Sequence, residues 1–183
     1  MKSLDRRYLK TEKTILDSFV ALLNQKRFED IQIEDICLEA DINKSTFYLH
    51  YQSLYYLLSA LEDSLVSSLE KALYEKENST LEEFVSFLVL FARENKKIFS
   101  ALFKSNDYRF NEKIRTVFFP FLSSKGSKRT ITQDNLLAFG LIDGVLSLFR
   151  AFTLTNNSKM TKEDFASFVV SFIRSLPLKK AFD

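Results

Sequence analysis

The chain has 183 residues, of which 46% are hydrophobic and 27% are charged, and its formal net charge is +2 at pH 7. These values are ordinary for a globular protein with a substantial core, and the net charge alone neither favours nor excludes a nucleic-acid partner. Three glycines and two prolines are too few turn-forming residues for an all-β fold, so the composition predicts an all-α protein.

Membrane insertion and secretion are both disfavoured. No apolar run approaches the roughly 18 uncharged residues that a membrane-spanning helix requires, and the N-terminal segment lacks the apolar core of a secretory signal. The single cysteine, Cys37, excludes an internal disulfide framework and fits a reducing compartment. We therefore expect a cytoplasmic protein without a membrane partner.

The first 53 residues predict a helix-turn-helix domain. Apolar side chains recur at helical spacing over residues 10–26, and a brief second helix is predicted over 34–40. Asn43 is a favourable N-cap for a third helix over 44–51. A long helix followed by two short ones with a tight break matches the helix-turn-helix arrangement, in which the last helix enters the major groove of DNA.

The third predicted helix has a face that suits a DNA groove. At about 100° per residue, Phe47 and Tyr51 fall together on the inner side. Ser45, Tyr48 and Leu49 fall on the opposite side, where hydroxyl groups meet base edges or phosphates and a leucine meets a thymine methyl group. This combination is unusual for a simple solvent surface and favours insertion into the groove.

Charge is unevenly distributed around this helix. Residues 29–41 carry six acids and no base, whereas residues 42–61 carry Lys44 and His50 and no acid. The acids should face away from a DNA surface because they repel phosphates. On charge alone, solvated helix surfaces explain the pattern equally well.

The span from Thr14 to Leu58 resembles the DNA-binding domain of TetR-family transcriptional regulators. The matching pieces are ILDSFVALL, RFEDIQIEDICLEA and INKSTFYLHYQSLYYLL. They follow that family's order of a helix, an aromatic-bearing turn, a short helix with Asp-Ile, and a recognition helix with Thr-Phe-Tyr. The form NKSTFYLHY is similar to a subgroup that includes regulators of dihydroxyacetone kinase operons.

The resemblance implies DNA contacts from the recognition helix and phosphate contacts from a basic N-terminal arm. The predicted DNA-contacting residues are Arg6, Arg7, Lys44, Ser45, Thr46, Tyr48, Leu49 and His50. It also implies a homodimer that sets two recognition helices about 34–36 Å apart on a pseudopalindromic double-stranded operator. The family's default is a repressor that a small-molecule effector releases, with activation as the other possibility.

Four positions depart from the family's usual residues. Arg27 and Asp41 stand where glycines are common, and Gln32 stands where a threonine cap is common. Asp41 tolerates a left-handed backbone better than most residues. Leu54 stands where a lysine commonly contacts a phosphate, which predicts a weaker affinity for DNA.

Residues 54–183 predict a helical regulatory and dimerisation domain. Ser53 caps a helix to about residue 76, and Ser79 with Glu82 forms a capping box for the next helix. Further helices are predicted after Asn95, over 107–122, over 132–154, and from Thr161 to before Pro177, with a loop over 123–129.

Phenylalanine is concentrated between residues 84 and 121. Most of these rings should form core, while the resemblance implies a ligand pocket among the helices that carry them. The candidate lining residues are Phe84, Phe87, Phe91, Phe99, Phe103 and Phe118. Arg93, Arg109 and Arg115 are candidates to hold an anion there, although exposed, solvated arginines are the simpler interpretation.

The segment 136–152 is apolar nearly all round, which predicts burial on more than one side. Asp143 needs a partner in such a setting, and we expect Arg150, on the same side two turns later, or its counterpart in a second copy. The resemblance implies that this segment and residues 165–173 form a dimer interface, against the alternative of a monomeric core. The predicted interface residues are Gly140, Asp143, Gly144, Phe168 and Phe172.

The sequence leaves two alternatives to a ligand-controlled regulator. A regulator controlled by a protein partner would need no small-molecule pocket. An enzyme is disfavoured because the sequence has no glycine-rich phosphate loop, no metal-ligand spacing and no nucleophile–base pair. The only histidine, His50, lies on the predicted DNA face, and Cys37 lies on an apolar helix face. We therefore expect no catalysis, no metal and no cofactor.

Overall fold

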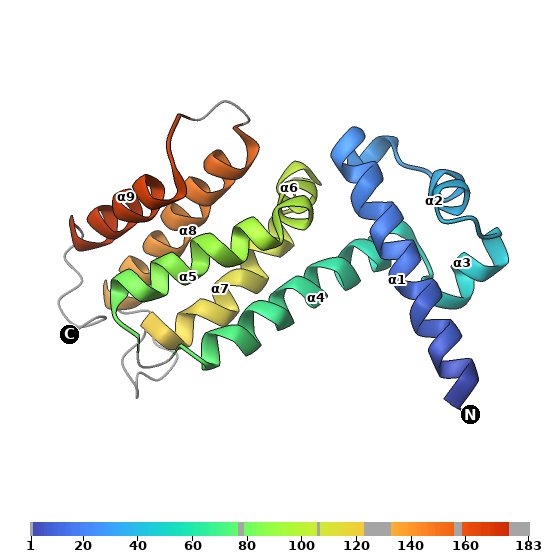
Figure 1. Cartoon of the computed structure of the whole chain (residues 1–183), viewed down its shortest axis with the longest axis horizontal. Helices are drawn as coiled ribbons and strands as arrows, with labels where there is room; N and C mark the ends of the chain where they lie inside the picture. The colour runs from blue at the N-terminus through green and yellow to red at the C-terminus, as the bar shows by residue number, and fades with distance from the viewer. Residues whose placement is uncertain (1, 77–78, 106, 123–132, 156–158, 176–183) are drawn as a thin grey trace.

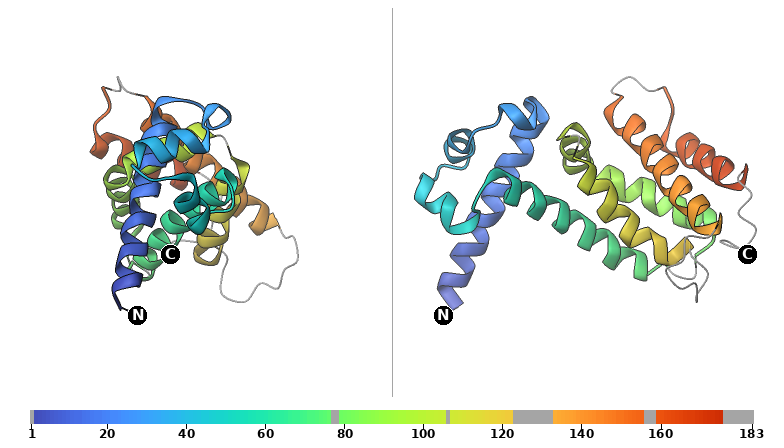
Figure 2. Two further views of the ribbon diagram at one scale, coloured as in Figure 1. Left: turned by 90° about the vertical axis from the view of Figure 1, so that its right-hand side faces the viewer. Right: turned by 180° about the vertical axis from the view of Figure 1, so that it is seen from behind.

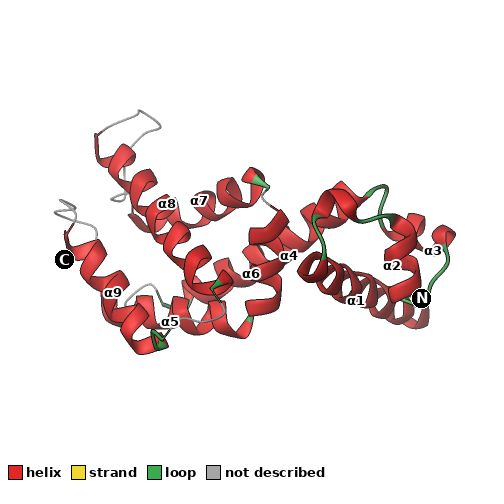
Figure 3. Ribbon diagram, turned by 90° about the horizontal axis from the view of Figure 1, so that it is seen from above, coloured by secondary structure: helices red, strands yellow, loops and turns green. Residues whose placement is uncertain are grey.

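The computed structural model describes residues 2–76, 79–105, 107–122, 133–155 and 159–175. Within these ranges all regular secondary structure is helical, which confirms the predicted all-α fold (Figure 3). The elements are α1 (Lys2–Gln25), the 3₁₀ helix η1 (Phe28–Asp30), α2 (Ile33–Glu39), α3 (Lys44–His50), α4 (Leu54–Tyr74), α5 (Leu81–Glu94), α6 (Lys96–Ser105), α7 (Tyr108–Leu122), α8 (Gln133–Leu154) and α9 (Lys162–Ser175). Among the described residues, no helix is both long and apolar enough to cross a membrane.

The helices form two groups at the ends of an elongated molecule. Helices α1, α2 and α3 gather at one end and α5 to α9 at the other, and α4 runs from the first group into the second (Figures 1 and 2). Its buried leucines follow the predicted spacing. They are Leu57, Leu58, Leu61, Leu65, Leu69 and Leu73.

The two groups also touch directly between α1 and α6. Asn24 Nδ2 donates a hydrogen bond to the Lys97 carbonyl at 3.0 Å, and Lys104 Nζ donates to the Asn24 carbonyl at 2.9 Å. Because α4 belongs to both groups and α6 contacts α1, the domain boundary expected between residues 53 and 54 stays a prediction.

Side-chain caps begin α3 and α4 where the sequence predicts them. Asn43 and Ser53 cap α3 and α4 through their side-chain oxygens. Asp41, in the turn between α2 and α3, adopts a left-handed φ of 51°, a conformation that aspartate tolerates. The local rules therefore fix the helix-turn-helix geometry.

Two predicted helix starts are wrong. Helix α1 begins near Lys2 rather than at residue 10, so the basic N-terminal segment is helical. The capping box of α5 lies one residue later than predicted: the Thr80 amide donates to Glu83 Oε2 at 2.9 Å, and the Glu83 amide donates to Thr80 Oγ1 at 3.3 Å. Ser79 lies one residue before this N-cap and donates its hydroxyl to the Lys76 carbonyl at 2.6 Å.

Candidate nucleic-acid interface and apolar cavity

Helix α3 presents the predicted inner and outer faces. Phe47 is fully buried and Tyr51 is 7% exposed, whereas Tyr48 is 54% and Leu49 is 76% exposed. Ser45 is also exposed. The predicted orientation of α3 is confirmed, because the buried aromatic pair anchors the helix on α1 and α2 and leaves the hydroxyl, phenol and leucine outside.

The first turn of α3 is organised by one oxygen atom. Asn43 Oδ1 accepts the Thr46 amide at 2.8 Å, the Ser45 hydroxyl at 2.7 Å and the Thr46 hydroxyl at 2.8 Å. Both hydroxyl protons therefore point back to the cap, while the oxygen lone pairs remain available. In this arrangement Ser45 and Thr46 would accept hydrogen bonds, as from the amino groups of cytosine or adenine.

Lys44, on the same face of α3, has an acidic partner. Its Nζ forms an ion pair with Glu34 Oε1 of α2, and both side chains are exposed. The hydrogen bond from Lys44 lowers the pKa of Glu34, and the same contact raises the pKa of Lys44. The expectation that the acids of 29–41 all face elsewhere is wrong for Glu34, because α2 and α3 bring the two side chains together across the turn.

His50, the last residue of α3, packs against α1. Its ring stacks on Tyr8, with centroids 4.0 Å apart and planes inclined by 25°. Its Nδ1 is buried without a hydrogen-bond partner, and burial lowers the pKa of His50, opposed by Glu12 nearby. His50 is therefore partly covered by Tyr8 rather than turned outward, and its DNA contact stays a prediction.

Arg6 and Arg7 lie on the first turns of α1. Both are exposed, and the N-terminal end of α1 projects past α3 (Figures 1 and 2). Helical backbone rather than an extended arm carries both residues. Their predicted phosphate contacts remain untested.

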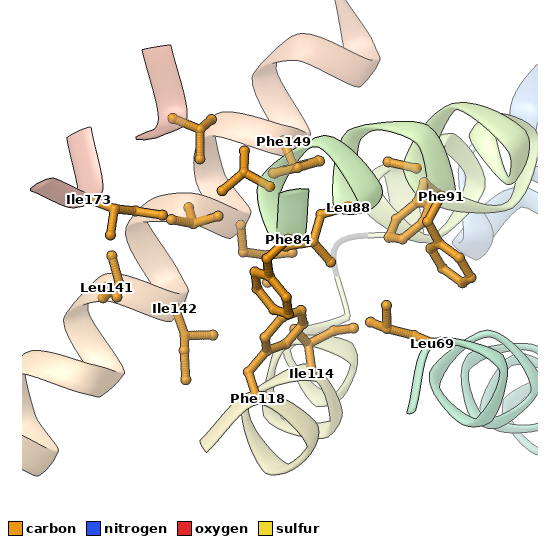
Figure 4. A pocket seen from close by; sticks show the side chains of 16 residues that line it. Leu69, Phe84, Leu88, Phe91, Ile114, Phe118, Leu141, Ile142, Phe149 and Ile173 are labelled. Carbon is orange, nitrogen blue, oxygen red and sulfur yellow. The ribbon is translucent and has the colours of Figure 1, made fainter. Parts of the chain in front are cut away.

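The other end of the molecule contains an apolar cavity. Helices α4 to α9 all contribute to its wall, and every lining side chain is a hydrocarbon (Figure 4). Its volume is about 80 Å³. The Phe84 and Phe118 rings meet edge to face inside it, with centroids 6.3 Å apart. Such a wall offers a ligand burial and no hydrogen bond.

The six candidate phenylalanines divide between the cavity and the core. Phe84, Phe91, Phe99 and Phe118 line the cavity. The other two do not: Phe87 lies beside Phe91, and Phe103 packs on Phe99 and Phe110 in the buried core. The sequence prediction missed the contribution of α8 and α9. That contribution comes from Leu141, Ile142, Val145, Leu146, Phe149, Val169 and Ile173, and the apolar run 136–152 was the available signal for most of it.

The predicted partner of Asp143 is wrong. Arg115 of α7, rather than Arg150, donates from Nε and Nη2 to the two carboxylate oxygens at 2.8 and 2.6 Å. This bidentate contact and the neighbouring Glu112 raise the pKa of Arg115. Arg109 likewise pairs with Asp107, so neither arginine holds a cavity anion, and the exposed arginine expected at 115 is instead an ion-pair partner.

The remaining predicted interface residues divide between a contact inside the chain and exposed positions on α8 and α9. Gly144 faces Phe172 within the chain, since a Cβ on Gly144 would lie 3.2 Å from the ring. A Cβ on Gly140 would meet nothing within 4 Å, and Phe168 is 48% exposed. Gly144 and Phe172 thus serve packing within one chain, while Gly140 and Phe168 lie on an open face. Whether that face pairs with a second copy stays a prediction.

A buried ion pair that the sequence did not indicate joins α4 to α7. The Glu62 side chain is fully buried, and its Oε2 lies 2.8 Å from Lys113 Nζ. Lys113 also lies 2.7 Å from Asp63 Oδ1. Burial raises the pKa of Glu62, opposed by Lys113. The pair ties the long connecting helix to the cavity-bearing group.

No family model and no curated protein matches the sequence. Solved structures do match. A TetR transcriptional regulator from Streptococcus agalactiae 2603V is 25% identical with a TM-score of 0.71, covering 94% of this chain and 98% of that one. A transcriptional regulator (TerR/AcrR family) from Aquifex aeolicus VF5 is 18% identical, with a TM-score of 0.67 and coverage of 90% and 98%. The dihydroxyacetone kinase operon activator DhaS is 19% identical, with a TM-score of 0.60 and coverage of 90% and 94%.

Proposed function

The chain has the fold of TetR-family transcriptional regulators, and we propose that it binds operator DNA through α3 and the start of α1. The observation that carries this proposal is the outward face of α3. Tyr48 and Leu49 are exposed, although a buried Phe47 next to them shows that the helix packs firmly. Exposing a phenol and a leucine together with a lysine and hydroxyls suits contacts to phosphates and base edges. The match to regulators also supports the expectation of a non-enzymatic protein.

We propose that the chain binds a pseudopalindromic operator as a homodimer. The open face of α8 and α9 carries Phe139 and Phe168, which are 38% and 48% exposed beside Gly140. Pairing this face with its copy across a two-fold axis would bury both rings. Two α3 helices would then address half-sites about 34–36 Å apart.

Regulation by a small-molecule effector is supported by the apolar cavity. The cavity lies among α4 to α9, and the start of α4 packs on the α1–α3 end, where the Tyr55 ring meets the Phe28 ring edge to face. An effector that prefers one arrangement of α4 would shift the spacing of the two α3 helices. We propose repression relieved by the effector. A reporter gene under the operator decides the direction, since one of the similar structures is named an operon activator.

The second candidate is a regulator controlled by a protein partner. The small volume of the cavity, about 80 Å³, favours it, since ligand pockets are typically about 300–1,000 Å³. A metabolite screen without any change in operator binding, together with a stable complex with a partner protein, would establish this alternative.

Selection of genomic DNA fragments by the purified protein tests the proposal. We expect enrichment of one sequence with two inverted half-sites about one helical turn apart. Sedimentation of the complex should give two chains per site. Enrichment of no sequence, or of a single half-site by one chain, would contradict the proposal.

A further inference from the structure

A groove lies beside the apolar cavity. It is formed by the ends of α5 and α8, the start of α6 and the start of α9, and its volume is about 510 Å³. Its floor is apolar and includes the buried Val89 and Phe149, whereas its rim is exposed and charged. The groove therefore differs from the cavity, whose wall is hydrocarbon throughout.

The rim of the groove carries an excess of positive charge. Arg93, Lys96 and Lys162 line it together with a single acid, Glu163. Glu163 Oε1 lies 3.4 Å from Lys162 Nζ, so this acid is already opposed by one of the three cations. Within the described ranges the structure records no ion pair for Arg93 or Lys96. These two cations are adjacent to the α5–α6 junction and are available to an anion from outside.

The groove and the cavity share part of their walls. Ala92 and Phe149 line both, so the groove and the hydrocarbon cavity adjoin at these two side chains. The cavity alone, at about 80 Å³, is smaller than the engineered cavity of about 150 Å³ that admits benzene in another protein. Cavity and groove together reach the size of an ordinary ligand site, about 300–1,000 Å³.

We propose that the effector is an organic anion with a hydrocarbon tail, such as a medium-chain carboxylate. This inference rests on the proposed regulation by a small molecule. The tail would pass Ala92 and place its last few carbons in the cavity, where a polar group would lose its hydrogen bonds to water. The carboxylate would lie at the rim and accept charge-assisted hydrogen bonds from Arg93 and Lys96.

The position of the head group would let ligand binding affect the α1–α3 end. Lys96 is the first residue of α6, and the carbonyl of the next residue, Lys97, accepts the hydrogen bond from Asn24 of α1. An anion that draws Lys96 toward the groove would act on the same turn of α6 that contacts α1. The bound state then differs from the free state at a contact between the two groups of helices, as a shift of population requires.

Calorimetric titration of the full-length protein without DNA tests the site. The probes are octanoate, 1-octanol with the same tail and no charge, and acetate with the same head and no tail. We expect octanoate to bind about tenfold more tightly than 1-octanol, the worth of a charge-assisted hydrogen bond, and acetate to show no binding. Equal affinities for octanoate and 1-octanol would overturn the proposal.

Three variants locate the two parts of the ligand. Arg93→Gln/Lys96→Gln should reduce octanoate affinity about tenfold to that of 1-octanol. Lys97→Gln removes one positive charge from a side chain that is next to Lys96 and lines neither hollow, and it should leave octanoate affinity unchanged. Ala92→Leu narrows the passage and should weaken octanoate and 1-octanol alike. Unchanged octanoate affinity in the double variant, with a melting temperature equal to that of the parent, would refute the head-group site.

Release of operator DNA separates this inference from the proposed function. We expect octanoate to lower the affinity of the parent protein for its selected operator, and the double variant to require about tenfold more octanoate. Full operator binding at saturating octanoate would overturn the ligand class and leave the DNA-binding proposal intact. A protein that selects no operator would overturn the proposed function, while the titration without DNA would still judge the site.

Discussion

The two ends of the molecule offer opposite chemistry to a ligand. At the α1–α3 end, buried aromatic rings such as Phe19 and Phe47 support an exposed face with amine, hydroxyl and phenol groups. At the α5–α9 end, the cavity wall offers hydrocarbon alone, and its charged groups lie at the rim of the adjoining groove. A face of the first kind suits a polyanion in water, and a hollow of the second kind suits an apolar tail. The two ends therefore suit different ligands, and α4 and the α1–α6 contact join them.

Loss of the buried ring at the α1–α3 end should have the largest effect on stability. Phe47 is fully buried, and replacing a buried phenylalanine by alanine typically costs about 3–5 kcal/mol of unfolding free energy. We expect Phe47→Ala to lower stability by that amount in urea denaturation and to abolish operator binding. Leu49→Ala, on the same helix at 76% exposure, is the control and should melt like the parent. Equal stability of both variants would mean that α3 is not anchored as described.

Removal of the exposed phenol should separate DNA binding from folding. We expect Tyr48→Ala to weaken operator binding about tenfold, since a side chain at a base or phosphate contact is worth about 1–3 kcal/mol. Tyr48 is 54% exposed, and its ring meets the Phe47 ring edge to face with the centroids 5.6 Å apart. The unfolding free energy of the variant should therefore lie within about 0.5 kcal/mol of the parent value. Anisotropy titration and thermal melting measure the two effects.

An exposed tyrosine far from α3 provides the matched control for that experiment. Tyr74, in the last turn of α4, is 69% exposed. Tyr74→Ala removes the same side chain from the other end of the molecule and should bind the operator like the parent. A large fall in the melting temperature of Tyr48→Ala would show that the phenol is part of the core, and the assignment of the outward face would fail.

Local rules explain why the α1–α3 end could be predicted from sequence. Asn43 and Ser53 cap helices through contacts three residues away, and Phe47 and Tyr51 are one helical turn apart. Such signals lie within a short window. Even here the Lys44–Glu34 pair was missed, because it depends on the angle between two helices rather than on either helix alone.

The α5–α9 end depends on contacts that no short window contains. Arg115 and Asp143 lie on different helices, 28 residues apart in sequence. Helical spacing within α8 alone therefore indicates Arg150 as the partner of Asp143. The cavity was sought among phenylalanines, yet α8 and α9 supply much of its wall through valine, leucine and isoleucine. The groove rim combines side chains from α5, α6 and α9, and its charge becomes visible only once these helices are placed.

The buried carboxylate between the two ends predicts a pH-dependent stability. Burial raises the pKa of Glu62 above its unfolded value of about 4.3. Its contribution to stability is therefore fully present below the unfolded pKa and is lost as pH rises through the folded pKa. Glutamine does not ionise, so Glu62→Gln should not lose stability in this way as pH rises, while Lys113 keeps its contact with Asp63. We expect the variant to gain about 1 kcal/mol relative to the parent between pH 4 and pH 8, the cost of a poorly hydrogen-bonded buried group.

Urea denaturation at a series of pH values measures this difference. Glu94→Gln, an exposed acid at the end of α5, is the control for the loss of one negative charge and should follow the parent curve. Lys113, Asp107 and Arg109 all act on the pKa of Glu62, so Lys113→Met should change the pH profile as well. A pH-independent difference between Glu62→Gln and the parent would mean that Glu62 titrates normally in the folded protein.

The smallest expected effect tests whether an acid restrains Lys44, which we propose contacts DNA. Lys44 pairs with Glu34 in the free protein, so phosphate must replace this partner before Lys44 contributes to binding. The pair is exposed, and exposed pairs are weak, so Glu34→Gln should tighten operator binding only about two- to fivefold and leave the melting temperature unchanged. Glu39→Gln, another exposed acid of α2, makes the same change in net charge and corrects for long-range attraction, which salt screens. The gain in operator affinity depends on Lys44, so Glu34→Gln/Lys44→Gln should bind the operator no more tightly than Lys44→Gln alone. If it persists there, Glu34 opposes DNA directly and Lys44 makes no contact with the phosphates.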